Sequence, residues 1–295
     1  MRTANYRATG LAVARVASHL RDFDAAETLA KSLAERTTGA WHAGALLMSA
    51  QIALAAGKRE RAIALFSRAQ SQDIDWALEL KAVSVLFPAA EASNEELTAL
   101  RDELTQWDPG ARTPSMTFFF LAHWQIHAQL RLYLRALVSA RLADTLSARM
   151  LGEELRRSGG DRTTRPVAVQ LMNSVRGHTA RTQGRLEDAA RLLASAHIES
   201  GPDEISVSPF LSRAHDRFVL ADVLVELGRS EEAERWYRSL TEGTDFQYVA
   251  AAHARLAAIA HTRGDAVAAQ HHREKAARLW RNADPALVGL IGSSM

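Results

Sequence analysis

A glycine followed five positions later by an alanine recurs along this sequence of 295 residues. The four occurrences pair Gly57 with Ala62, Gly184 with Ala189, Gly228 with Ala233, and Gly264 with Ala269. Glycine readily adopts the left-handed conformation that ends a helix, so a short turn can follow it. The small alanine then lies where two antiparallel helices approach closely. The pattern therefore predicts helical hairpins that repeat along the chain.

Three further segments have the same spacing if the turn residue need not be glycine. They pair Arg21 with Ala26, Asn94 with Ala99, and Ala143 with Ala148. The turn positions 21, 57, 94, 143, 184, 228 and 264 are then 36 to 49 residues apart. Ser93 and Glu96 also have the spacing of a helix capping box. We predict an all-α fold, a right-handed superhelical solenoid of about seven hairpins that forms a single domain over residues 1–295.

Composition narrows the function classes. Hydrophobic residues make up 47% of the chain and charged residues 24%, which is typical of a folded globular protein. The absence of cysteine excludes disulfides, cysteine nucleophiles and thiolate metal sites. The formal net charge of +2 is too small for a protein built mainly to neutralise nucleic-acid phosphates. We therefore expect no nucleic-acid partner.

Apolar segments of the chain are short. The most apolar run, residues 116–122, is followed by polar residues and is far below the roughly 20 residues that span a bilayer. Arg15 interrupts the apolar stretch near the N-terminus, where a secretory signal needs an unbroken one. We expect a soluble, cytoplasmic protein with no membrane partner.

The hairpin segments resemble tetratricopeptide repeats. With Gly228 as the turn glycine, the positions at which that family places its large, small and aromatic residues are filled by Leu220, Ala221, Leu224, Ala233 and Tyr237. The better-matching repeats cover residues 166–295, and the repeats over residues 1–165 are degenerate. The resemblance implies that each hairpin packs on its neighbours and leaves a concave groove.

The C-terminal third is similar to the repeat domains of large bacterial signalling proteins, in which such repeats follow a serine/threonine kinase, a cyclase or a transcriptional activator. Residues 236–240 (WYRSL) and 279–287 (LWRNADPAL) carry this likeness. The chain contains none of the kinase motifs HRD, DFG or VAIK. The similarity implies a non-catalytic interaction or sensing module, with a fused or partner effector domain and no cofactor of its own.

In the tetratricopeptide family, the first helix of each hairpin lines the groove, where a protein or peptide binds. Transfer of those positions to this sequence implies seven groove residues: Gln51, His178, Arg181, His215, Phe218, Asp222 and His261. The paired Lys and Asn pattern with which some members bind a peptide carboxylate is missing. The resemblance therefore implies a peptide or protein partner without implying a C-terminal tail.

Two alternative functions stay open. His123 and His127 are four residues apart, as two metal ligands on one helix face would be, and would serve a helical metal-dependent enzyme. His271 and His272 are adjacent, so on a helix they point apart and do not bind one ion together. The second alternative is a purely structural array that forms oligomers.

Overall fold

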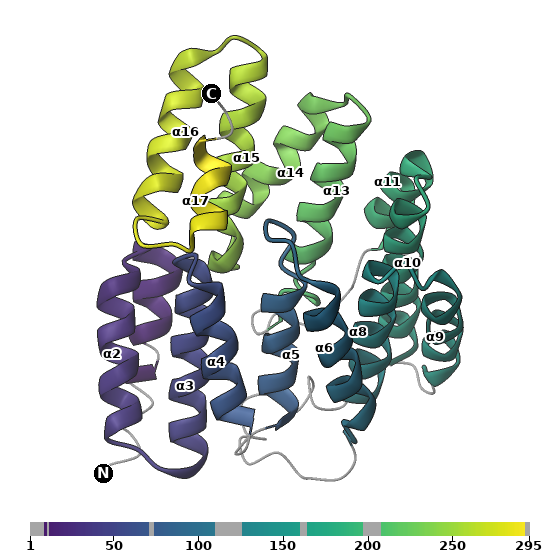
Figure 1. The fold of residues 1–295 in the computed structure, drawn as a ribbon, viewed down its shortest axis with the longest axis horizontal. Helices are drawn as coiled ribbons and strands as arrows, with labels where there is room; N and C mark the ends of the chain where they lie inside the picture. The colour runs from purple at the N-terminus through teal and green to yellow at the C-terminus, as the bar shows by residue number, and fades with distance from the viewer. Residues whose placement is uncertain are drawn as a thin grey trace. The chain divides into compact units, whose positions relative to one another are not determined.

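A computed structural model of the chain describes residues 9–10, 12–70, 74–109, 126–159, 164–196 and 208–292. Within these residues the regular structure is helical and no β-strand occurs, so the all-α prediction is confirmed for them. The chain divides into two compact units (Figure 1). Unit 1 contains Met1–Ser84 and Tyr237–Met295, and unit 2 is the continuous segment Val85–Trp236.

Unit 1 combines helices from both ends of the sequence. In the N-terminal part, α2 packs on α3 and α3 on α4, and in the C-terminal part α15 packs on α16, with α17 against both. The elements are η1 (Val16–Leu20), α2 (Phe23–Glu35), α3 (Gly39–Ala55), α4 (Arg59–Gln70), α5 (Ile74–Val85, whose last residue belongs to unit 2), η2 (Phe246–Tyr248), α15 (Val249–Thr262), α16 (Ala266–Leu279) and α17 (Pro285–Gly292).

Unit 2 contains a succession of helices that pack in chain order from α6 to α13. The pairs in contact are α6 with α8, α8 with α9, α9 with α10, α10 with α11, and α11 with α13, and α8 also touches α10. The elements are α6 (Asn94–Gln106), α8 (His127–Arg141), α9 (Thr145–Ser158), α10 (Thr164–Thr182), α11 (Leu186–Ser195), α13 (Ala214–Glu226) and the first part of α14 (Ser230–Glu242).

The predicted turns have one common geometry. Six of the seven predicted turn residues have a positive φ: Arg21, Gly57, Ala143, Gly184, Gly228 and Gly264. At every turn residue except Arg21, the amide of the next residue donates to the carbonyl five positions before that amide. Examples are Lys58 N to Ala53 O at 2.8 Å and Arg185 N to Ala180 O at 2.9 Å. This is the Schellman arrangement that satisfies the last carbonyls of a helix. The alanines five positions after the six turn residues are fully buried, as predicted: Ala26, Ala62, Ala148, Ala189, Ala233 and Ala269.

The prediction at Asn94 is wrong. Asn94 is the first residue of α6 and has no positive φ, and Ala99 is exposed. The predicted capping box explains the difference: the Ser93 hydroxyl accepts from the amide of Glu96, and the Glu96 carboxylate accepts from the amide of Ser93. These bonds begin the helix at Asn94, so its buried face is set by Leu97, Leu100 and Leu104 instead.

Segments from the two ends of the sequence meet within unit 1. The Trp280 indole N–H donates to Ala55 O at 3.2 Å, and the Asp284 amide donates to Gly57 O at 2.8 Å. Trp280 is fully buried in this contact, and Arg281 forms an ion pair with Asp24. The segment between α16 and α17 therefore covers the turn between α3 and α4, a contact that the local repeat pattern does not predict.

Candidate functional site

Five of the seven predicted groove residues lie on two helices of unit 2. His178 and Arg181 are on α10, and His215, Phe218 and Asp222 are on α13. Unit 1 contains the other two, the partly exposed Gln51 on α3 and the exposed His261 near the end of α15. The candidate site is therefore the α10–α13 region, and a role in partner binding stays a prediction for each of the seven.

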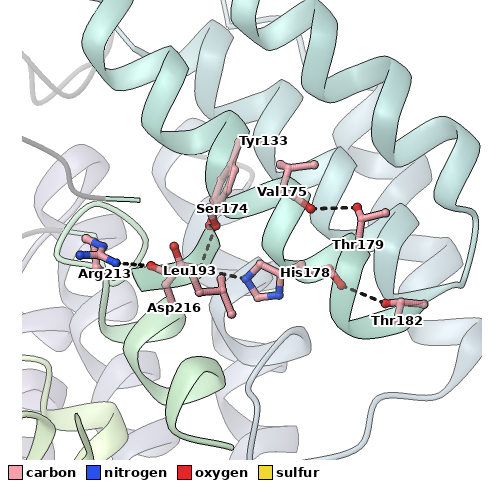
Figure 2. Close-up of polar contacts among 9 residues, drawn as sticks. All are labelled: Tyr133, Ser174, Val175, His178, Thr179, Thr182, Leu193, Arg213 and Asp216. Carbon is pink, nitrogen blue, oxygen red and sulfur yellow. Dashed lines mark hydrogen bonds and ion pairs between the residues drawn. The ribbon is translucent and has the colours of Figure 1, made fainter. Parts of the chain in front are cut away.

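A buried network of hydrogen bonds joins α8, α10 and α13 (Figure 2). His178 Nε2 and Ser174 Oγ both donate to Asp216 Oδ1, at 2.9 Å and 2.8 Å. Because Ser174 uses its proton in that bond, the Tyr133 hydroxyl, 3.0 Å away, donates to the serine oxygen. All four side chains are buried. We call Tyr133, Ser174, His178, His215 and Asp216 the Asp216 cluster.

Helix geometry explains how the Asp216 cluster assembles. Ser174 and His178 are four residues apart on α10, so they lie on one face and reach the same acceptor. Asp216 is in the first turn of α13, where the helix dipole favours a negative charge. A buried carboxylate is strongly destabilising unless it is paired and hydrogen-bonded, and these two donors supply that compensation.

Burial also sets the protonation states in the cluster. Burial lowers the pKa of His215 to about 3, and the neighbouring His178, stacked on it with ring centroids 5.3 Å apart, acts in the same direction. Burial would raise the pKa of Asp216, but the hydrogen bonds from His178 and Ser174 and the nearby imidazoles hold it below its usual value. His215 is therefore neutral and Asp216 ionised at neutral pH.

Acid should weaken the fold through His215. The unfolded chain binds a proton at this residue near pH 6.5, whereas the folded chain does so only near pH 3. Above pH 6.5, the neutral imidazole therefore makes its full contribution to the free energy of unfolding. That free energy decreases as the pH falls toward 3, by about 3 kcal/mol at about pH 4.5. Urea unfolding of wild type and His215→Gln at neutral and acidic pH measures this contribution. Equal pH dependence in the two proteins would contradict it.

A second group of charges lies farther along the same two helices. Arg181 is 2.6 Å from Glu226 and 3.9 Å from Asp222, measured between guanidinium nitrogen and carboxylate oxygen. The side chains of Arg181 and Glu226 are 30% and 42% exposed, so both are accessible to a partner, whereas Asp222 is nearly buried. Phe218, one helical turn before Asp222, is fully buried in the core. We call Arg181, Asp222 and Glu226 the charged triad.

Sequence reasoning missed Tyr133, Ser174, Asp216 and Glu226. The transfer of family positions selects residues within one repeat, whereas Asp216 bonds residues 38 and 42 positions away. One local signal was available. Eight of the twelve residues from Ala214 to Val225 are apolar, which favours a buried helix, and a charged residue in a buried helix needs a partner.

The arrangement does not form a nucleophile–base pair. Ser174 and His178 each bond the carboxylate of Asp216, and no hydrogen bond joins serine to histidine in this cluster.

Among the described residues, no group of three or more His, Cys, Asp or Glu side chains is placed to hold a metal ion. His127 is buried with its ring 5.7 Å from that of Trp107, and His123 lies outside the described residues.

Across the described part of the chain, no helix is both long and apolar enough to cross a bilayer.

Comparisons with known proteins identify the fold. No protein-family model matches the sequence, and no curated protein matches it. The structure is similar to that of NprR, crystallised in complex with its cognate peptide NprX, with a TM-score of 0.51 and 10% identity over 90% of this chain and 74% of the other. A tetratricopeptide repeat protein from Parabacteroides merdae has a TM-score of 0.42 and 14% identity, over 97% of this chain and 98% of the other. The likeness to NprR concerns the fold alone and confirms the predicted helical-repeat architecture.

Proposed function

We propose that this chain, a tetratricopeptide-like helical-repeat protein, is a non-catalytic binding module that recognises a peptide or protein segment. The observation that carries the proposal is the charged triad. It joins two first helices of neighbouring predicted repeats, and it leaves Arg181 and Glu226 partly exposed. In this proposal, the first helices of the hairpins line a groove that contains the triad.

The charged triad has suitable chemistry for a peptide. The Arg181 guanidinium provides several donors in a plane, and the Glu226 carboxylate accepts from backbone or side-chain N–H groups. Because the ion pair is partly exposed, its net contribution to stability is small, so a ligand can replace it at little loss. The Asp216 cluster, nearer the start of α13, fixes α10 against α13 and limits the ordering needed on binding.

The proposed setting is a regulatory system of a bacterial cytoplasm. A partner or fused effector would then respond to ligand binding at the repeats. The resemblance of residues 236–240 and 279–287 to bacterial signalling proteins supports this setting. NprR, which shares the fold, was crystallised with a peptide.

A random peptide library displayed on phage tests the proposal directly. We expect selection on the full chain to yield peptides whose dissociation constants increase at least about tenfold in Arg181→Ala, as for loss of one well-placed charged contact. Arg185→Ala is the matched control, because Arg185 also forms a partly exposed ion pair, with Asp188, in the same unit. Thermal unfolding checks that both variants are folded.

Two results would contradict the proposal. The first is that no peptide is enriched on the chain. The second is that Arg181→Ala and Arg185→Ala bind the selected peptides equally well. A structural oligomerisation array predicts the first result, together with a self-association in light scattering that Arg181→Ala leaves unchanged.

A further inference from the structure

A cavity of about 290 Å³ lies within unit 1, where segments from the two ends of the sequence meet. Three segments form its wall: residues 20–24, where η1 ends and α2 begins, the turn between α3 and α4, and the end of α16 (Figure 1). Small-molecule sites have volumes of about 300–1,000 Å³, so this cavity has the size for a small molecule and not for a polypeptide segment.

Cationic side chains outnumber acidic ones in the lining of the cavity. The cations are Arg21, Lys58, Arg278 and Arg281, and the acids are Asp22 and Asp24. Both carboxylates already have partners. The Asp22 carboxylate accepts from the amide of Ala25 at 3.1 Å and so caps α2, and the Asp24 carboxylate forms an ion pair with Arg281. The lining therefore keeps an excess of positive charge.

The charges of Lys58 and Arg278 are balanced to different extents. The Lys58 ammonium is 3.5 Å from the carboxylate of Glu27, which does not line the cavity and also pairs with Arg61. Arg278 is exposed, and no carboxylate of the described residues lies within ion-pair distance of it. One carboxylate is thus shared by two cations, and a third cation has none, so the cavity should attract anions.

Arg21 has a buried donor that lacks an acceptor. One terminal nitrogen of its guanidinium donates to Gly243 O at 2.6 Å, whereas the other, Nη1, is buried and has no hydrogen-bond partner in the described part of the chain. Burial lowers the pKa of this guanidinium, and the negative charge of Asp245 opposes that shift only in part. A buried donor of a charged group is costly when it has no acceptor, and an anion in the cavity would supply one.

We propose that this cavity binds a phosphoryl group, either as free phosphate or as the phosphate of a small monoester. Planar guanidinium groups match the oxygens of phosphate well, and Arg21 and Arg278 provide two of them in the lining. A phosphate monoester has a charge of about −1.5 to −2 at neutral pH, which complements the excess of cations. Phe23 and Leu279 also line the cavity and offer apolar surface to the organic group of a monoester.

A ligand in this cavity would connect the two ends of the chain. Arg21 belongs to the N-terminal part of unit 1, and Arg278 belongs to the C-terminal part. A phosphoryl group that is bound by both can bind only while these parts are packed together. Its binding should therefore stabilise unit 1 against unfolding by mass action.

Thermal unfolding and calorimetry of the full chain at pH 7.5 and constant ionic strength test the site with phenyl phosphate, inorganic phosphate and phenol. At about a hundredfold excess over its dissociation constant, a phosphate probe should raise Tm by about 5 °C. Phenol, which lacks the phosphoryl group, should leave Tm unchanged. Tighter binding of phenyl phosphate identifies a monoester as the ligand, and binding of inorganic phosphate that is at least as tight identifies free phosphate.

Three variants assign the binding to the cavity. Arg278→Gln should raise the dissociation constant of the phosphate probes about tenfold, because it removes one charged contact. Lys275→Gln is the matched control, since Lys275 is a cation on the same helix that does not line the cavity, and it should bind like wild type. Arg21→Gln should weaken binding further, and the exposed Arg278 keeps the test valid if that variant does not fold.

The phosphoryl site is overturned if neither phosphate probe raises Tm, or if Arg278→Gln binds the probes like wild type. It is also overturned if Lys275→Gln weakens binding as much as Arg278→Gln, because the anions would then be attracted to basic surface in general. The peptide-binding proposal concerns residues of unit 2 and is measured with selected peptides, so it stands or fails independently of these results.

Discussion

Replacement of Asp216 by alanine should lower the free energy of unfolding by about 2–5 kcal/mol, because it leaves two buried donors without their acceptor and each unsatisfied donor costs about 1–3 kcal/mol. The variant leaves His178 and Ser174 without the acceptor that both use. The free energy of unfolding of a folded domain is only about 5–15 kcal/mol, so this substitution should remove a large part of the protein's stability. Urea unfolding at neutral pH gives the size of the loss.

Two further variants separate the causes of this effect. Asp216→Asn keeps an oxygen acceptor but removes the charge, so its loss should be smaller than that of Asp216→Ala. Asp188→Ala removes an exposed carboxylate that pairs with Arg185 and Arg191, and the urea midpoint should change little. If Asp216→Ala were as stable as Asp188→Ala, the network would contribute nothing to the fold. Hydrogen exchange should become faster in α8, α10 and α13 specifically.

Gly57→Ala should be the most destabilising of the turn substitutions, by about 2–4 kcal/mol. A residue other than glycine loses about 1 kcal/mol or more in the left-handed conformation, here at φ 76°. A Cβ on Gly57 would also overlap the side chain of Ala283 and lie 3.0 Å from Trp280 Cδ1, and such overpacking costs about 1–3 kcal/mol. Chemical unfolding, with hydrogen exchange in α3, α4 and α17, measures the loss.

Gly184→Ala isolates the backbone part of that effect. Gly184 has nearly the same φ, 72°, and a Cβ there would meet nothing within 4 Å. This variant should therefore lose only about 1 kcal/mol. Equal losses at the two glycines would mean that the contact between Gly57 and the segment around Trp280 can relax without penalty.

The repeat fold was predictable because its determinants are local. A turn residue with positive φ and a buried alanine five positions later both lie within one hairpin, and the structure has this geometry at six of the seven expected turns. The exception at Asn94 also has a local origin. The capping box at Ser93 begins the helix at Asn94, so Asn94 is a helix start and not the turn residue that ends a preceding helix.

The interactions that distinguish this protein from a generic repeat were not predictable in the same way. Asp216 and His178 are 38 residues apart, and the Trp280 indole bonds a carbonyl 225 residues away. Such pairs depend on the rotation and stacking of whole helices, which side-chain periodicity does not specify. The histidines show the same point: His271 and His272 are adjacent in sequence, but the ring that meets His272 across the hairpin is that of His253.

The bond between Trp280 and Ala55 has a consequence for synthesis on the ribosome. Residues 1–84 are synthesised well before Trp280, which covers the turn at Gly57, and the whole of unit 2 lies between them. Unit 2 is continuous in sequence and can complete its packing as it emerges, since domains generally fold as units during translation. Until α16 and α17 are made, the surface that Trp280 covers stays exposed, so the nascent chain should depend on chaperones most strongly at that stage.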